Sequence, residues 1–346
     1  MSTPTTQKAL VLPSKFGELI IQDIPVPRPG PGQILVKIKS TSLNPVDWKI
    51  QKHGWFIDQF PAILGTDIAG DVEAIGEGVT QWSKGDRVFF QGTFEIEGAS
   101  FQQFAIGNAA TAAKIPDNIS YDQAASIPVT LTCSYVGLFN KEPYGLGFDA
   151  PTTVARKGTY AGNPLVILGG SSSVGQFAIQ LAKLVGFSPI ITTASAKHND
   201  YLKSLGADYV LDRNLSTSAL SAEISKLTDK PIKAAFDSIS SKETQQTGHD
   251  LLASGGKLCV VLDRTANITE DKTVIHTLGV LNLPHNIGLL TNMYAAVSQW
   301  LEEGVIKPNK VEVIPGGLAG ITEGLKRLEN DQVSGSKLVV HPQETA

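Results

Sequence analysis

An apolar run, PLVILGG, leads directly into a segment of serine and glycine residues, SSSVG. Gly170, Ser172 and Gly175 fill the three glycine positions of a G-x-G-x-x-G turn, with serine at the middle one. Such a turn points free backbone N–H groups and the positive end of the next helix at a pyrophosphate, and serine hydroxyls can add donors. The turn therefore predicts a dinucleotide site, although a tight strand-to-helix turn without a ligand remains an alternative. The candidate residues are Gly170, Ser171, Ser172, Ser173, Val174 and Gly175.

The next apolar strand, PIITTAS, lacks the acidic residue that commonly binds the ribose hydroxyls of NADH at this position. Ser195, Lys197 and His198 stand there instead. A hydroxyl and two potential cations suit the additional phosphate of NADPH. The sequence thus favours NADPH as the cofactor. The alternative is that Lys197 and His198 are solvated residues at the start of a helix.

Two patterns of elements position these residues. Residues 8–107 contain short alternating strands separated by turn residues, which indicate an irregular β-barrel or sandwich. Near Ser120, a capping box formed with Gln123 begins a helical segment that Pro128 interrupts. Residues 164–283 alternate apolar strands with amphipathic helices and predict an α/β fold with a doubly wound parallel sheet. The helices predicted after the dinucleotide turn are 174–185, 199–205, 218–227 and 243–252, and a C-terminal helix is predicted at 319–329.

The composition of the chain excludes several classes of protein. The 346 residues carry a formal charge of -4 with scattered basic residues, which argues against nucleic acid as a partner. Cys133 and Cys259 lie far apart, so neither a disulfide framework nor a cysteine zinc lobe is expected. A reducing cytoplasm fits this cysteine usage. No apolar stretch long enough to span or anchor in a membrane is seen.

Four segments in a fixed order resemble the medium-chain dehydrogenase/reductase superfamily: LNPVDWK, FPAILGTDIAGDVEAIGEGV, KGDRVF and GGSSSVGQFAIQLAK. The resemblance covers nearly the whole chain and is strongest to the zinc-free quinone and enoyl reductase branches, particularly fungal trans-acting enoyl reductases. It implies a GroES-like β-barrel catalytic domain formed by residues 1–131 and 297–346. A Rossmann domain that binds NADPH would be inserted between them at residues 132–296.

The resemblance also bears on metal. Zinc alcohol dehydrogenases of this superfamily have a cysteine at the position of Asn44, a His-Glu pair at Thr66 and Asp67, and a further ligand near Val129. Catalytic zinc needs about three Cys, His or acidic ligands, and only Asp67 could serve. We therefore expect no metal ion.

Several further roles are implied by the same resemblance. Asn44 would lie by the nicotinamide and donate to a carbonyl or orient the ribose, and Lys49 would be a proton donor. Thr130 would contact the nicotinamide amide. The remaining cofactor candidates are Val260, Val261 and Leu262, which would supply backbone near the ring, and Lys337, which would reach the cofactor from the C-terminal segment. The alternatives are a local cap for Asn44, an exposed Lys49, an ordinary core for the apolar residues and a strand-edge lysine.

The expected reaction follows from the lack of a Lewis acid. Hydride transfer to a conjugated enone, a 2-enal, an enoyl thioester or a quinone spreads charge into an enolate or hydroquinone anion, which a few hydrogen bonds can stabilise. Trp48, Trp55 and Phe56 are candidates for the wall of an apolar substrate cleft. We predict an NADPH-dependent enoyl or enone reductase. The alternatives are a quinone reductase, or a non-catalytic NADPH-binding protein or polyketide-synthase partner. A monomer or a homodimer is expected, with KLCVV as a possible edge strand for pairing.

Overall fold

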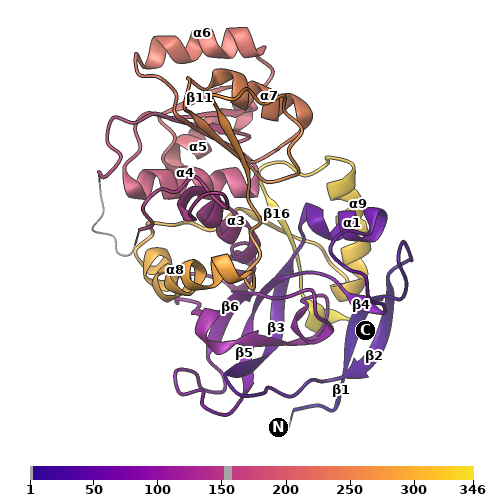
Figure 1. Cartoon of the computed structure of the whole chain (residues 1–346). Coiled ribbons are helices and arrows are strands. Elements are labelled where there is room, and N and C mark those ends of the chain that lie inside the picture. Colours follow the sequence, from indigo (N-terminus) through magenta and orange to yellow (C-terminus); the bar gives the residue numbers. More distant parts are fainter. Residues whose placement is uncertain (1–2, 152–157) are drawn as a thin grey trace. The chain divides into compact units, whose positions relative to one another are not determined.

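The computed structural model describes residues 3–151 and 158–346, which form two compact units. Unit 1 contains the chain up to Val129 together with Val297–Glu302 and Pro308–Ala346. Unit 2 contains Thr130–Ala296 and Glu303–Lys307. Each unit is described by itself, and Figure 1 shows the elements of both.

Unit 1 is built on two β-sheets. A three-stranded sheet has the order β2-β1-β4, and a larger sheet has the order β15-β16-β3-β5-β6-β8, with β7 paired to β3. Buried residues dominate β3, β5 and β6, more than the half-burial that an alternating apolar sequence predicts. The strands are β1 (Thr6–Leu12), β2 (Ile20–Pro25), β3 (Gln33–Ser42), β4 (Ala62–Ile63), β5 (Asp67–Ile75), β6 (Arg87–Gln91), β7 (Phe104–Asn108), β8 (Ala113–Lys114), β15 (Val311–Val313) and β16 (Lys337–Val340).

The C-terminal segment joins the sheet formed by the N-terminal part of the chain. β16 pairs antiparallel with β3, with Val339 opposite Ser42, while β3 pairs with β5, with Ser42 opposite Asp67. These two registers bring the end of β3 and the starts of β5 and β16 together, although about 300 residues of sequence separate β16 from β3. Lys337, Ser42 and Asp67 therefore lie close to one another.

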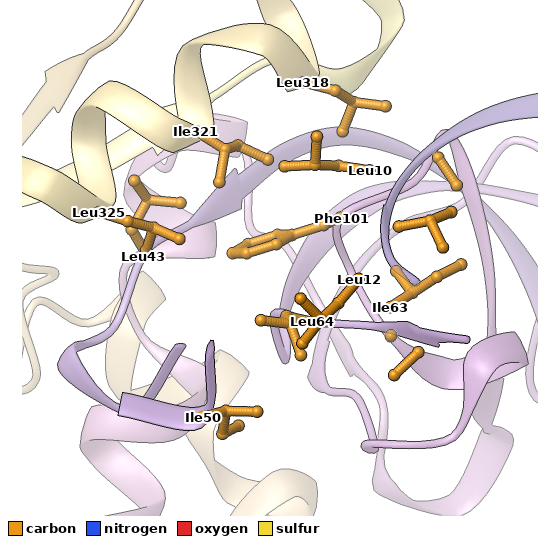
Figure 2. Packing of buried hydrophobic residues seen from close by; sticks show 14 of the residues in the cluster. Leu10, Leu12, Leu43, Ile50, Ile63, Leu64, Phe101, Leu318, Ile321 and Leu325 are labelled. Atoms are coloured by element: carbon orange, nitrogen blue, oxygen red, sulfur yellow. The ribbon is translucent and has the colours of Figure 1, made fainter. Parts of the chain in front are cut away.

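The helices of unit 1 are α1 (Pro45–His53), α2 (Tyr121–Ala125) and α9 (Gly320–Glu329). The sequence did not predict α1, although Pro45 at its first position and Gly54 after its end, with φ 67°, are typical of helix boundaries. The capping box predicted at Ser120 and Gln123 is confirmed. Ile321 and Leu325 of α9 pack with Leu43 and Phe101 in a buried cluster that also includes Ile50 of α1 (Figure 2). This apolar packing fixes the helix that begins after Asn44.

Unit 2 contains the predicted doubly wound sheet. Its strand order is β11-β10-β9-β12-β13-β14, and all neighbours are parallel. The strands are β9 (Leu165–Leu168), β10 (Ile190–Ala194), β11 (Tyr209–Asp212), β12 (Ala234–Asp237), β13 (Lys257–Val260) and β14 (Thr273–His276). The helices are α3 (Pro128–Phe139), α4 (Ser173–Val185), α5 (Asn199–Leu205), α6 (Thr217–Leu227), α7 (Lys242–Leu251) and α8 (Pro284–Glu302), of which α3 and α8 each have a few residues in unit 1.

The expectation that KLCVV forms an edge strand is wrong. β13, which contains this segment, lies between β12 and β14, so β14 is the edge strand of the sheet. The four residues TVIH of β14, of which only Val274 and Ile275 are apolar, follow a long turn-rich loop, which hid the strand in the sequence. By contrast, the predicted helices of this unit agree with α4 to α7 within one residue at each boundary. No helix in the two described ranges combines the length and the apolar character that crossing a membrane requires.

Candidate functional site

The turn between β9 and α4 leaves specific backbone donors free. Gly169 N donates to Thr193 Oγ1 at 3.1 Å, and Gly170 N donates to Thr193 O at 3.0 Å. Gly175 N donates to Ser172 Oγ at 2.9 Å. In contrast, the N–H groups of Ser171 and Val174 have no partner among the described residues. Ser171 lies two residues before the first residue of α4, and Val174 is the second residue of this helix. The helix dipole favours an anion at this end of the helix.

Glycine is required at this turn for steric reasons. A Cβ atom at Gly175 would lie 2.4 Å from the carbonyl oxygen of Gly169 and 2.8 Å from Gly170 Cα. A Cβ atom at Gly170 would lie 2.1 Å from Thr192 Oγ1. Gly169 has φ 77°, a left-handed conformation that side chains disfavour. The backbone path that exposes the free N–H groups therefore depends on all three glycines.

The side chain of Ser172 is used within the protein. Its Oγ caps α4 by accepting from Gly175 N, and it donates to Ser238 Oγ at 2.9 Å. Ser238 in turn donates to the carbonyl oxygens of Leu168 and Gly169. The suggestion that the serine hydroxyls are spare donors is therefore wrong for Ser172. Its hydroxyl instead links the end of β9 to the end of β12, where the strand order reverses.

The carboxyl end of β10 carries the residues predicted to discriminate between cofactors. Ser195 precedes a short 3-10 helix, Ala196–His198, and its side chain makes no capping hydrogen bond. Lys197 is exposed, and Ser195 and His198 are half-buried. Since parallel strands end at one edge of a sheet, these residues and the β9–α4 turn lie at the same edge of unit 2.

Arg213 is a further cation at this edge that the sequence reading missed. Ala194 pairs with Asp212 across β10 and β11, and Arg213 N donates to Ala194 O at 3.1 Å. The side chain of Arg213 is exposed and forms no ion pair with any described residue. Its position after the third strand of the parallel series was the signal that could have found it. Arg213 is therefore bonded through its backbone to Ala194, the residue that precedes Ser195.

The other cofactor candidates of unit 2 are backbone positions. Val260 ends β13, and Val261 N donates to Ser240 Oγ at 2.8 Å, so this N–H is already used. Leu262 follows Val261 and is half-buried. Thr130 lies near the start of α3, is 4% exposed, and accepts a hydrogen bond from Ser134 Oγ through its carbonyl.

In unit 1, Asn44 lies in a buried cluster of charged side chains. Its Nδ2 donates to Asp67 Oδ2 at 2.7 Å, and its Oδ1 accepts from Lys337 Nζ at 2.5 Å. Lys337 Nζ also lies 3.1 Å from Asp67 Oδ2. Asn44 precedes α1, yet its side chain is directed to these two residues, so capping is not the sole use of its amide. Lys337 is 4% exposed, which is a different environment from an ordinary strand-edge lysine.

The Asp67 carboxylate also accepts hydrogen bonds from two neutral donors. Its Oδ2 accepts from Ser42 Oγ at 2.6 Å, and its Oδ1 accepts from Val129 N at 2.7 Å. Asp67 and Ser42 are both fully buried. The carboxylate is therefore fixed by four donors, two of which come from Asn44 and Lys337.

Asp47 is a second buried carboxyl beside this cluster, and the sequence reading did not assign it. Its Oδ2 accepts from Asn44 N at 2.7 Å, whereas its Oδ1 has no hydrogen-bond partner among residues 3–151 and 158–346. Burial, aided by the charge of Asp67, raises the pKa of Asp47 to about 7 despite the opposing effects of Asn44 N and Lys337. Asp47 is therefore a group whose charge changes near neutral pH.

Lys49 projects from α1 into an aromatic environment. Its Nζ lies 5.6 Å from the ring centroid of Trp48 and 5.4 Å from that of Trp55. Partial burial lowers the pKa of the Lys49 ammonium, against the attraction of Asp331. The aromatic rings continue to Phe56, which is 56% exposed and stacks on Phe94 with centroids 5.8 Å apart. These rings form a partly exposed apolar surface next to a cation.

The structure thus brings the predicted residues together in two groups. Asn44 and Lys337 are in direct contact in unit 1, and Lys49 extends from the same helix that Asn44 precedes. The glycine turn, Ser195 to His198 and Val260 to Leu262 share one edge of the sheet of unit 2. Thr130 belongs to unit 2 as well.

Comparisons with known proteins agree with this division. One family model, the alcohol dehydrogenase GroES-like domain, matches residues 30–119, and a second, named zinc-binding dehydrogenase, matches residues 173–275. The trans-enoyl reductase resD of Aspergillus sclerotiorum is 31% identical over 348 residues, which cover 92% of this chain and 96% of that protein.

Solved structures show the same fold. An alcohol dehydrogenase superfamily protein from Novosphingobium aromaticivorans superposes with a TM-score of 0.82 at 22% identity, covering 97% of this chain and 99% of the other. A mycobacterial protein complexed with NADPH has a TM-score of 0.76 at 22% identity, covering 97% of this chain and 100% of the other.

Proposed function

Because this chain belongs to the medium-chain dehydrogenase/reductase superfamily and is an oxidoreductase of that family, we propose that it reduces activated C=C bonds with NADPH. The substrate class is a 2-enal, an enone or an enoyl thioester. The observation that carries this proposal is the side-chain amide of Asn44, held between a buried carboxylate and a buried ammonium. The similarity to a trans-enoyl reductase over nearly the whole chain supports it.

The residues of unit 2 fit a bound dinucleotide. The free N–H groups of Ser171 and Val174 lie at the start of α4 and suit a pyrophosphate. Lys197, His198 and Arg213, with the hydroxyl of Ser195, suit the 2′-phosphate of NADPH. Thr130 and the backbone at Val260 to Leu262 are proposed to face the nicotinamide. In unit 1, Lys337 is a further cofactor candidate, because its ammonium has a third hydrogen besides those directed at Asn44 and Asp67. When bound, NADPH supplies the hydride.

The name of the second family model raises the question of zinc, and the side chains of unit 1 do not fit this ion. Of the positions that the resemblance compares with zinc ligands, only Asp67 has a suitable side chain. Both of its oxygens already accept hydrogen bonds, and the Lys337 ammonium lies 3.1 Å from one of them. A divalent cation placed there would be repelled by this ammonium. No group of three or more His, Cys, Asp or Glu side chains in the described ranges could hold a metal ion.

The geometry around Asn44 suits stabilisation of an enolate. An amide N–H donates to the carbonyl oxygen of the substrate, and the hydrogen bond strengthens as negative charge develops on that oxygen. A conjugated acceptor needs only this modest stabilisation, because the charge is delocalised. Lys49, whose pKa partial burial lowers, is proposed to protonate the α-carbon. Trp55 and Phe56 offer apolar surface to the substrate chain.

A substrate panel tests the proposal. NADPH oxidation is measured with crotonyl and longer 2-enoyl thioesters, 2-enals, enones, simple ketones and quinones, and each rate is repeated with NADH. We expect turnover of the conjugated carbonyl compounds with NADPH and little with simple ketones.

The other outcomes assign the alternatives. Turnover of quinones alone would replace the C=C reductase with a quinone reductase. Tight binding of NADPH without oxidation across the panel would indicate a non-catalytic NADPH-binding protein. Asn44→Ala and Lys49→Ala with unchanged turnover would remove the roles proposed for these two side chains.

A further inference from the structure

The amide of Asn44 has charged groups of opposite sign on its two sides. Lys337 Nζ contacts Oδ1 at 2.5 Å, and Asp67 Oδ2 contacts Nδ2 at 2.7 Å. An asparagine amide in an unrestrained site can turn by 180° and exchange its oxygen and nitrogen. A lysine ammonium only donates hydrogen bonds, whereas an ionised carboxylate only accepts them. The flipped amide would therefore face a donor with its NH2 group and an acceptor with its oxygen.

We infer that Lys337 and Asp67 are positioning residues that hold the Asn44 amide in a single orientation, with one N–H hydrogen left for the substrate carbonyl. This inference rests on the proposed function, since that function places the carbonyl at Asn44. Of the two hydrogens on Nδ2, one is given to Asp67, and the other has no partner among the described residues. Asn44 thus presents one directed donor.

The two positioning residues are themselves held by the fold. Asp67 begins β5 and is fixed by Ser42 Oγ and Val129 N in addition to Asn44 and Lys337. Lys337 begins β16, which pairs with β3 next to Ser42. The side chain of Asp67 is 0% exposed and that of Lys337 is 4% exposed, so water competes little with their contacts. The backbone of Asn44 is anchored separately, because its N–H donates to Asp47 Oδ2.

The contact with Lys337 also favours the remaining N–H as a donor. The ammonium of Lys337 withdraws electron density from the amide through Oδ1, and hydrogen bonds in series strengthen one another in a site of low dielectric constant. A donor aligned in advance costs no reorganisation when charge develops on the substrate oxygen. The ion pair therefore acts on the reaction through Asn44, without touching the substrate.

A double-mutant cycle tests this dependence. Asp67→Asn is nearly isosteric but can both donate and accept hydrogen bonds, so only Lys337 still favours the observed orientation of the Asn44 amide. We expect kcat with an enoyl or enal substrate to fall about 10- to 100-fold, with the Kd for NADPH changed less than about threefold. Asn44→Ala should cause a loss of similar size. The double variant should be no slower than Asn44→Ala alone, because Asp67 has no other route to the substrate.

Thr41→Val is the matched control. Thr41 precedes Ser42, and its hydroxyl donates a buried hydrogen bond of 2.7 Å to Ser100 Oγ, which the substitution removes. This hydroxyl is not hydrogen-bonded to Asn44, Asp67 or Lys337. We expect its turnover to stay within about twofold of the wild type even if its stability falls. If Asp67→Asn does not fold, the same cycle is measured with Lys337→Met, which keeps the length of the side chain. For this variant kcat is taken at saturating NADPH, because Lys337 is also a cofactor candidate.

The outcomes separate the inference from the proposed function. If Asp67→Asn lowers kcat by the same factor with and without Asn44, the two residues act independently and the inference is overturned. Full activity of Asp67→Asn overturns it as well. Wild-type turnover of Asn44→Ala would overturn both the role of Asn44 and its positioning, whereas the substrate panel would still decide whether the chain is a reductase.

Discussion

The polar groups of the two candidate regions have opposite environments. In unit 1, Asn44, Asp67 and Lys337 are buried side chains that satisfy one another's hydrogen bonds. At the carboxyl edge of the sheet in unit 2, the important groups are backbone N–H groups left unsatisfied and cations left in solvent. A buried, coupled cluster links its charges to folding and to pH. A turn with exposed cations should instead depend mainly on backbone shape, with each side chain adding a small independent amount.

The largest effect on ligand binding is expected from the backbone of unit 2. Gly175→Ala places a Cβ atom 2.4 Å from the carbonyl oxygen of Gly169, which forces the turn to move and misaligns the N–H groups of Ser171 and Val174. We expect affinity for NADPH to fall by about 100-fold or more, a loss of about 3 kcal/mol. Isothermal titration calorimetry or quenching of protein fluorescence measures this change.

Gly288→Ala is the control for this substitution. Gly288 lies within α8, where a Cβ atom would meet nothing within 4 Å, so alanine should bind NADPH as the wild type does and favour the helix. If Gly175→Ala bound NADPH normally, backbone shape would not dominate in unit 2, and the contrast between the two regions would lose its main support.

The next largest effect is expected from the buried carboxyl of unit 1. The pKa of Asp47 is raised from 3.8 to about 7, so the folded protein holds a proton that the unfolded chain releases. The stabilisation from this protonation is complete below about pH 4 and is lost as pH rises to about 7. Asp47→Asn keeps an oxygen for Asn44 N but does not ionise. Its stability relative to the wild type should therefore increase by about 2 kcal/mol between pH 5 and pH 8.

Chemical denaturation of both proteins at several pH values measures this difference. His341 also titrates, since Glu344 and Asp122 raise its pKa against the effect of burial, but it is common to both proteins and cancels in the comparison. Stability curves of the two proteins that run parallel from pH 5 to pH 8 would mean that Asp47 is not coupled to folding. In that case the charge of the buried cluster would contribute as little to the pH dependence of stability as we expect of the exposed cations in unit 2.

The contrast between the regions also explains what could be predicted from the sequence. The glycine turn and helices α4 to α7 were predictable because caps and apolar periodicity are local. The contact of Lys337 with Asp67 was not, because it depends on the pairing of β16 with β3 across nearly the whole chain. Arg213 was missed for a similar reason, since its relevance comes from the register between β10 and β11. Residues separated widely in sequence meet only after strands have paired.

The smallest effects are expected from the exposed cations of unit 2. Lys197→Ala and Arg213→Ala should each weaken NADPH binding by about tenfold, or about 1.4 kcal/mol, because each removes one solvated contact to the 2′-phosphate. Binding of NADH, which lacks this phosphate, should stay within about twofold, and the two losses should add in the double variant since neither side chain is shown to contact the other.

Lys203→Ala, on an exposed position of α5, is the control and should leave both affinities unchanged. Because these charges are exposed, higher salt should reduce the preference for NADPH in the wild type and leave little to reduce in the double variant. Equal losses for NADH and NADPH would show instead that these cations bind the pyrophosphate or stabilise the fold, and the assignment of the 2′-phosphate to this edge would be wrong.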